Sequence, residues 1–329
     1  MGDTCTAAVY GATGALGKEV RVGLEGLDVD IAALVSVAGV RSAGEVVPWR
    51  GSRRAVVGPR EVDLATIDLA IVATPRDVAR EEIPRLRERG VFVVDLSGAR
   101  ATGPGDPLPV LWPHVATDAL EHHPGGFAMP GAAASTVAPI LHALVQAGVE
   151  ITGVDAVELA TAGDFGRAGP EALSKQTVGL LGYKVFEPDP FREALAFNVL
   201  DAAPGDDAHA ERFIDELHEL LPALTVPLRL TTIFVPAFAG IAVICTVRTA
   251  GELPSDDALA KALDGHPDLE LVPEGVVLRD AMDSDAVHVS PPRRDPDGTL
   301  RVVAVADPLH RIGQRAAILV KHILDEELW

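Results

Sequence analysis

The chain has 329 residues, a length at which one hydrophobic core usually gives way to two domains. Apolar residues make up 48% and charged residues 23%, which is the composition of an ordinary globular protein and not of a disordered one. The formal net charge of -20 disfavours binding to nucleic acid or to anionic membranes, because both require a concentrated basic surface. We therefore expect small-molecule partners, with no nucleic-acid and no membrane partner.

The cysteines and the N-terminus indicate a cytoplasmic protein. Cys5 and Cys245 are far apart in apolar segments, so neither a disulfide framework nor a thiolate metal site is indicated. No signal-peptide pattern is present, and no run of about 18 uncharged apolar residues follows. His122 and His123 are adjacent in a segment with Pro and Gly, which predicts a solvated loop. No metal site is predicted.

The first segments predict a dinucleotide-binding Rossmann domain. Residues 5–10 are typical of a short buried strand, a glycine cluster follows, and residues 18–27 have a helical pattern. The glycines would let the backbone approach a pyrophosphate at the helix N-terminus. Glycine-rich turns also occur without ligands, but the order of strand, turn and helix favours a cofactor site. The predicted contacts in this turn are Gly11, Thr13, Gly14, Ala15, Leu16 and Gly17.

The end of the second predicted strand favours NADP as the cofactor. Residues 30–37 form this strand, and no acidic residue stands at its end to hold the ribose hydroxyls of NAD. Arg41 and Ser42 follow, and a guanidinium and a hydroxyl can bind a 2′-phosphate. The alternative is that Arg41 is an ordinary solvated surface residue.

Further βα units predict a doubly wound parallel sheet. Residues 69–73 and 91–95 are apolar strands, and residues 78–89 are an amphipathic helix. Ligands of such sheets bind beyond the carboxyl ends of the strands. Ala73 and Thr74 are therefore predicted cofactor contacts. Arg100 is a candidate clamp for an anion or phosphate, with a surface ion pair as the alternative.

Several motifs along the chain resemble the aspartate-semialdehyde dehydrogenase superfamily. They lie at residues 11–17, 41–44, 95–100, 166–173, 195–199, 283–289 and 306–309. The stretch 166–198 is most similar to the Usg-type homologues of that family. The resemblance implies an α/β fold with a Rossmann domain at 1–128 plus 308–329. It also implies an α+β dimerisation and substrate domain at 129–307, with an antiparallel sheet, and a homodimer. A final helix at 312–327 would return to the first domain.

The resemblance also implies that the family's catalytic groups are missing. Working members use a cysteine at a helix N-terminus to attack the aldehyde, a histidine as base and an arginine for the substrate carboxylate. Ala134, Ile241 and Phe234 stand at these positions here. Ser135 lacks an activating base and is expected to cap the following helix, and Cys245 is expected in the core.

Three hypotheses for the function follow. The first is an NADP-binding homologue without the phosphorylating semialdehyde dehydrogenase activity. The second is hydride transfer to another carbonyl or imine without covalent catalysis, since a nicotinamide can deliver hydride by itself. The third is the family activity itself, in amino-acid biosynthesis, against which the three apolar side chains argue.

Overall fold

The computed structural model describes residues 5–27, 29–99, 107–116, 120, 123–183, 186–202 and 207–329. The chain divides into two compact units, residues 1–131 with 312–329 and residues 132–311. Arg100, His122 and residues 203–206 lie outside the described residues, so the anion clamp expected at Arg100 stays a prediction.

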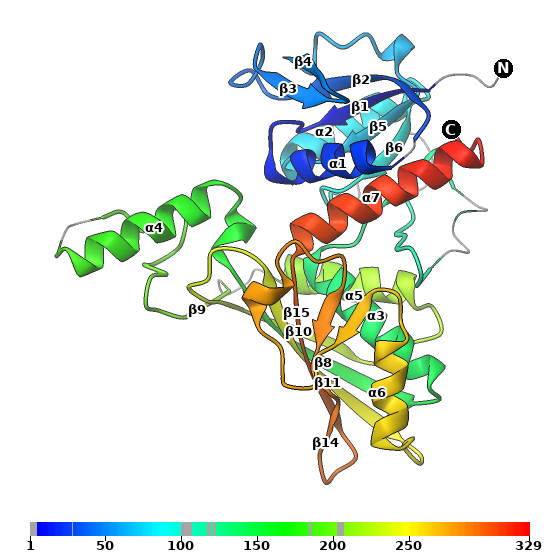
Figure 1. Cartoon of the computed structure of the whole chain (residues 1–329), viewed down its shortest axis with the longest axis vertical. Helices are drawn as coiled ribbons and strands as arrows, with labels where there is room; N and C mark the ends of the chain where they lie inside the picture. Colours follow the sequence, from blue (N-terminus) through cyan, green and yellow to red (C-terminus); the bar gives the residue numbers. More distant parts are fainter. Residues whose placement is uncertain are drawn as a thin grey trace. The chain divides into compact units, whose positions relative to one another are not determined.

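The first unit is built on a seven-stranded sheet in the order β3-β4-β2-β1-β5-β6-β7 (Figure 1). The strands are β1 (Cys5–Tyr10), β2 (Ile31–Val37), β3 (Val46–Trp49), β4 (Ser52–Val57), β5 (Leu69–Val72), β6 (Phe92–Asp95) and β7 (Gly126–Ala128). All neighbouring pairs are parallel except β3 and β4, which form an antiparallel hairpin at one edge. The predicted Rossmann-like parallel sheet is confirmed.

Helices cover both faces of this sheet. Helix α2 (Arg76–Arg87) packs through Ala79, Ile83 and Leu86 on the face that carries Tyr10 and Val72. Successive side chains of a strand point to opposite faces of the sheet. The neighbours of Tyr10 and Val72 along β1 and β5 therefore point to the other face, and they are buried too, so that face is covered as well. Helices α1 (Ala15–Gly26) and α7 (Pro308–Asp325) pack closely against each other, because a Cβ on Gly23 would lie 2.9 Å from the Cβ of Ala317.

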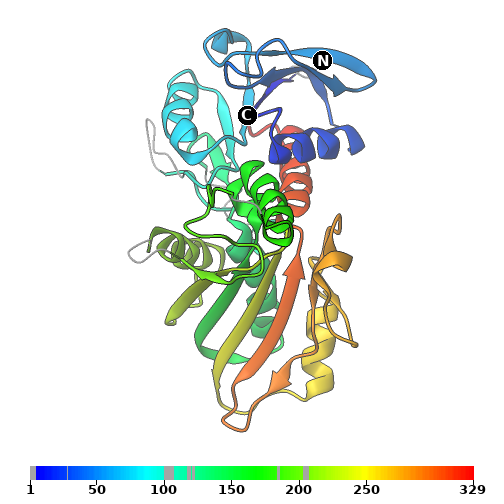
Figure 2. The same cartoon turned by 90° about the vertical axis from the view of Figure 1, so that its left-hand side faces the viewer.

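The second unit contains an eight-stranded sheet in the order β12-β13-β15-β11-β8-β10-β9, with β14 beside β15. Its long strands are β8 (Glu150–Ala160), β10 (Leu228–Phe234), β11 (Ile241–Ala250) and β15 (Leu300–Ala306), and they lie side by side and twisted in Figure 2. The short ones are β9 (Leu200–Asp201), β12 (Leu269–Leu271), β13 (Val287–Val289) and β14 (Arg293–Arg294).

The expected antiparallel sheet is wrong in part, because this sheet is mixed. Strand β10 pairs with β8 in parallel, and β12 pairs with β13 in parallel. The β8–β10 connection contains a 3₁₀ turn η3 (Ala162–Phe165), helix α4 (Ala168–Leu181), strand β9 and helix α5 (Ala208–Leu220). Such a long crossover returns the chain to the same end of the sheet, which produces parallel strands.

Helices cover one face of the second sheet. Helix α3 (Ala132–Gln146) packs on β8, β11 and β15, helix α5 packs on β10, and α3 also contacts α6 (Asp256–Asp264). Along β11 buried residues alternate with half-buried ones, so the opposite face is only partly covered. Helix α4 stands away from the sheet (Figure 1). No described helix combines the length and the apolar character that crossing a membrane requires.

The predicted final helix begins earlier than residue 312. Helix α7 starts at Pro308, directly after Asp307. Proline is favoured at a first helical position, and the Asp307 carboxylate accepts a hydrogen bond from the His310 amide at 3.1 Å. The apolar spacing alone did not reveal this polar first turn.

Candidate functional site

The glycine turn of the first unit is built so that strand and helix meet without side chains between them. Gly11 has a φ of 83°, and a Cβ there would lie 2.3 Å from the Ala73 carbonyl oxygen. A Cβ on Gly17 would lie 2.2 Å from the Gly11 carbonyl oxygen. Only glycine permits these approaches. Gly11 and Gly17 therefore shape the backbone cradle that the sequence predicts.

The N-terminus of α1 can receive an anion. Gly14 is its N-cap residue and supplies no side-chain hydrogen bond, and the first turn contains no acidic residue. Thr13 and Ala15 are exposed beside it, and Leu16 is half-buried. The first amides of a helix have no partner within the helix and carry partial positive charge, so they bind phosphate groups. These features fit a dinucleotide pyrophosphate.

The end of β5 offers a polar atom beside the cradle. The Thr74 hydroxyl is buried and has no hydrogen-bond partner, while the Ala73 amide donates to the Tyr10 carbonyl oxygen at 2.9 Å. Buried hydroxyls normally have partners, so the Thr74 hydroxyl is suited to a ligand. The structure thus places Ala73 next to Gly11, as the alignment of strand ends predicts.

The turn after β2 lies beside the glycine turn. The Val37 carbonyl oxygen accepts hydrogen bonds from the amides of Gly11 and Ala12, at 2.8 and 3.0 Å. Two residues of the following turn are the predicted phosphate contacts: Arg41 is exposed and Ser42 is half-buried. Both residues therefore follow the strand end that is hydrogen-bonded to the glycine turn, and their contact with a 2′-phosphate stays a prediction.

The loop after β6 is held by a residue that the sequence analysis did not single out. The buried Asp95 carboxylate accepts hydrogen bonds from the Ser97 amide at 2.8 Å and from its hydroxyl at 2.5 Å. Arg76, the first residue of α2, donates to the Gly98 carbonyl oxygen through Nε at 3.2 Å and Nη2 at 3.0 Å. Arg76 thus holds this loop, and its place directly after Thr74-Pro75 was the available signal.

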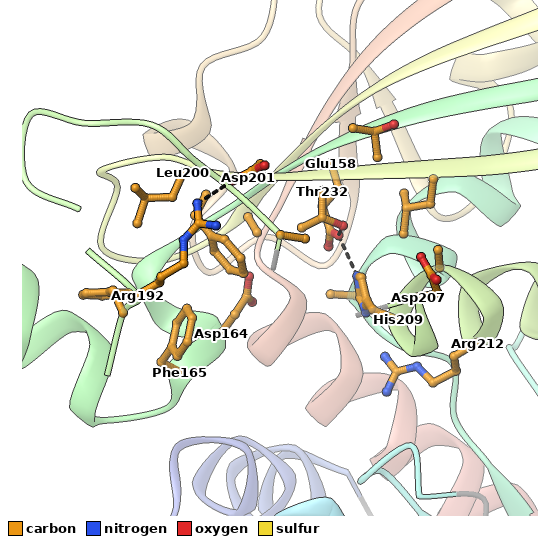
Figure 3. A pocket seen from close by; sticks show the side chains of 18 of the residues that line it. Glu158, Asp164, Phe165, Arg192, Leu200, Asp201, Asp207, His209, Arg212 and Thr232 are labelled. Carbon is orange, nitrogen blue, oxygen red and sulfur yellow. Dashed lines mark hydrogen bonds and ion pairs between the residues drawn. The ribbon is translucent and has the colours of Figure 1, made fainter. Parts of the chain in front are cut away.

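The second unit contains a cavity of about 910 Å³ between β8, β10, α5 and the segment 190–202 (Figure 3). Ligand pockets have volumes of about 300–1,000 Å³, so this cavity can hold a small molecule. Its charged lining residues are Glu158, Asp164, Arg192, Asp201, Asp207, His209 and Arg212. The sequence predicted none of them. The sequence signal that could have pointed to Glu158 is its position as the one acidic residue in the otherwise apolar segment 156–160.

Glu158 forms the polar centre of this cavity. Its carboxylate accepts a hydrogen bond from the Thr232 hydroxyl at 2.8 Å and contacts His209 Nε2 at 2.6 Å. The side chain of Glu158 is 3% exposed, whereas that of His209 is 36% exposed. The hydrogen bond to Glu158 raises the pKa of His209, because it stabilises the imidazolium. Figure 3 shows this pair on one side of the cavity.

The three positions that the resemblance assigns to catalytic groups lie in the second unit. Phe234, at the end of β10, lines the cavity, and so does Ala132 at the start of α3. Ala134 and Ile241 are buried, with 1% and 2% exposure, and do not line it. The structure therefore brings the Phe234 position and the start of α3 to one cavity.

One prediction about an individual side chain is wrong, and a second is wrong in part. Ser135 does not cap α3: it lies inside the helix, buried, and its hydroxyl donates to the Ala132 carbonyl oxygen at 3.0 Å. His123 lies in a loop as predicted but is half-buried, because its ring packs 5.0 Å from that of Phe92 and 5.4 Å from that of Phe127, centroid to centroid. Adjacent apolar strands supplied this contact, which the local sequence does not show.

The cysteines are buried as predicted for Cys245. Both thiols are free and buried, and burial raises the pKa of Cys5 and of Cys245 to about 12. Since the thiolate is the reactive form, neither is a nucleophile at neutral pH. Among the described residues, no group of three or more His, Cys, Asp and Glu side chains is placed to hold a metal ion.

Comparisons with known proteins agree with this geometry. Residues 6–123 match the family model described as semialdehyde dehydrogenase, NAD binding domain. A USG-1 protein homolog from Pseudomonas aeruginosa is 29% identical, and the match covers 88% of each chain. An aspartate-semialdehyde dehydrogenase from Legionella pneumophila is 24% identical over 97% of this chain and 95% of that protein.

Solved structures are similar over the whole chain. A probable aspartate-semialdehyde dehydrogenase from Pseudomonas aeruginosa has a TM-score of 0.91 and 27% identity, over 99% of this chain and 100% of that one. Aspartate semialdehyde dehydrogenase II from Vibrio cholerae has a TM-score of 0.88 at 21% identity, over the same shares. The chain therefore has the fold of these dehydrogenases, and its first unit contains a nicotinamide-dinucleotide-binding domain.

Proposed function

We propose that this chain is an NADP-binding homologue of aspartate-semialdehyde dehydrogenase, of the USG-1 type, that lacks the phosphorylating oxidation of the semialdehyde. Ala134 carries the proposal. It occupies the first turn of α3, where the family places its thiol, and a methyl group cannot form a thiohemiacetal. No other cysteine of the chain can take the place of this thiol, because both cysteines are buried elsewhere.

The surroundings of Ala134 support the same proposal. Ile241, at the position of the family base, pairs in the strand with Ala306 and offers no group that could take up a proton. Phe234 offers no positive charge to a substrate carboxylate. With nucleophile, base and carboxylate-binding group all apolar, a charged intermediate would gain no stabilisation from these positions.

The cofactor part rests on the first unit. Gly11, Gly14 and Gly17 form the cradle for the pyrophosphate, and Thr74 supplies a hydroxyl beside it. Arg41 and Ser42 would hold the 2′-phosphate and so favour NADP over NAD. When bound, the nicotinamide supplies a hydride donor or acceptor. We assign the cavity of the second unit to the substrate or another small-molecule ligand.

We also propose that the protein is a cytoplasmic homodimer. Large apolar side chains on and after α4 are exposed, with Val178 at 63%, Leu181 at 70% and Tyr183 at 100%. Exposed apolar clusters mark protein–protein contacts more often than free surface. Two free thiols without a disulfide are typical of a reducing compartment.

An activity assay on the full chain tests the proposal. With aspartate semialdehyde, inorganic phosphate and NADP, we expect no formation of NADPH, while the same preparation binds NADPH in a fluorescence titration. The titration shows that the sample is folded and able to bind its cofactor. Turnover at rates near those of a working dehydrogenase assayed in parallel would overturn the loss of activity, and absence of NADPH binding would overturn the cofactor assignment.

A further inference from the structure

The cavity of the second unit has an aromatic wall. Phe165 and Phe234 are both half-buried at its edge, and their ring centroids are 5.2 Å apart. Phe191 joins them edge-on, 4.9 Å from Phe165. The face of a phenyl ring carries negative potential and attracts organic cations, in addition to covering apolar groups.

An acidic group stands next to this wall. Asp164 precedes Phe165 in η3, and its carboxylate accepts a hydrogen bond from the Thr161 amide at 3.2 Å. Asp164 is exposed, and its side chain lines the cavity. A cation bound beside Asp164 would stabilise its ionised form.

The positive side chains of the lining already have acidic partners. Arg192 pairs with Asp201 at 2.5 Å, His209 with Glu158 at 2.6 Å and Arg212 with Glu216 at 3.3 Å. None of these cations is paired with Asp164 or with Asp207, which also lines the cavity. Among the described lining residues the balance is therefore negative, and it favours a cationic ligand over an anionic one.

We propose that this cavity binds a small organic amine as its ammonium ion, with the apolar part of the amine against Phe165 and Phe234 and the nitrogen beside Asp164. An arginine at position 234 would instead favour an anionic ligand. The inference takes from the proposed function only that the cavity is the ligand site of the second unit, and amine binding needs no dinucleotide.

Isothermal titration calorimetry on the full chain tests the charge preference. The probes are 2-phenylethylamine, neutral 2-phenylethanol and anionic 3-phenylpropanoate, which share a phenyl ring and a similar length. At about pH 8 Asp164 is ionised and an alkylamine remains protonated. We expect the amine to bind about tenfold more tightly than the other two probes. Equal or tighter binding of the carboxylate, or no binding of the amine, would overturn the inference.

Three variants locate the site. Asp164→Asn should weaken amine binding about tenfold and leave binding of 2-phenylethanol unchanged, since only the cation loses a partner. Asp257→Asn, at the exposed start of α6, makes the same charge change outside the cavity and should change neither. Phe234→Arg should reverse the preference towards 3-phenylpropanoate.

The outcomes separate this inference from the proposed function. An unchanged amine affinity in Asp164→Asn would overturn the amine site and leave NADP binding in the first unit untouched. Melting temperatures of the variants establish that each is folded before its affinities are compared.

Discussion

In the proposed cofactor site, the preference for NADP would depend on a single guanidinium, that of Arg41. The turn that carries it begins directly after Val37, whose carbonyl oxygen is hydrogen-bonded by the glycine turn. Arg41 is exposed and can move to meet a phosphate, and Ser42 adds a hydroxyl. A guanidinium on a 2′-phosphate forms charge-assisted hydrogen bonds, which contribute about 1.5–3 kcal/mol.

Replacing Arg41 should therefore weaken the binding of NADP much more than the binding of NAD, because the two cofactors differ only in the 2′-phosphate. In Arg41→Ala we expect the Kd for NADP to rise by about tenfold to a hundredfold and the Kd for NAD to stay within about twofold. Fluorescence titration with both reduced cofactors measures this. Arg89→Ala, an exposed arginine beyond the far end of α2, is the control. An unchanged preference in Arg41→Ala would show that another group selects the phosphate.

At the scale of elements, the junction of β1 and α1 leaves no room for a side chain at Gly17. The helix can approach the strand only because Gly17 has no side chain. The same helix ends at Gly26, where a Cβ would meet no atom within 4 Å. One helix thus contains a glycine that packing requires and one that packing does not.

This contrast gives a matched pair of variants. Gly17→Ala should lower the free energy of unfolding by about 2 kcal/mol, because the methyl group overlaps the Gly11 carbonyl, and should abolish NADP binding. Gly26→Ala should leave binding intact and change stability by 0 to about +1 kcal/mol. Urea unfolding and cofactor titration measure both effects. Equal behaviour of the two variants would contradict the assigned role of Gly17.

At the scale of the molecule, each of the two units contains one of the two candidate sites. The dinucleotide cradle lies in residues 1–131 with 312–329, and the cavity lies in residues 132–311. A ligand that binds only the folded form of one unit stabilises that unit by mass action.

NADP should consequently protect the two units unequally. At a concentration of about 100 times its Kd it contributes about 2.7 kcal/mol to the stability of the unit that binds it. Hydrogen exchange followed by mass spectrometry should therefore show slower exchange in β1 and α1, with β11 unchanged. The Gly17→Ala variant is the control without binding. Equal protection of β1 and β11 would mean that the units unfold together.

Elements whose signals are local could be predicted from the sequence. The strand, glycine turn and helix at residues 5–26 could be predicted because glycine spacing and apolar periodicity are properties of neighbouring residues. The absence of a reactive cysteine at position 134 needs only the sequence and a resemblance. Cys245 was assigned to the core correctly from its apolar neighbours alone.

The cavity, the sheet pairing and the burial of single residues could not be predicted, because the contacts that create them join distant segments. Glu158 contacts His209, which is 51 residues away in the sequence, and Thr232, which is 74 residues away, so no local pattern predicts the cavity. The parallel pairing of β8 and β10 follows from a crossover whose return direction the sequence does not state. The burial of Ser135 and the partial burial of His123 could not be predicted for the same reason: burial depends on what packs over a residue, and that comes from elsewhere in the chain.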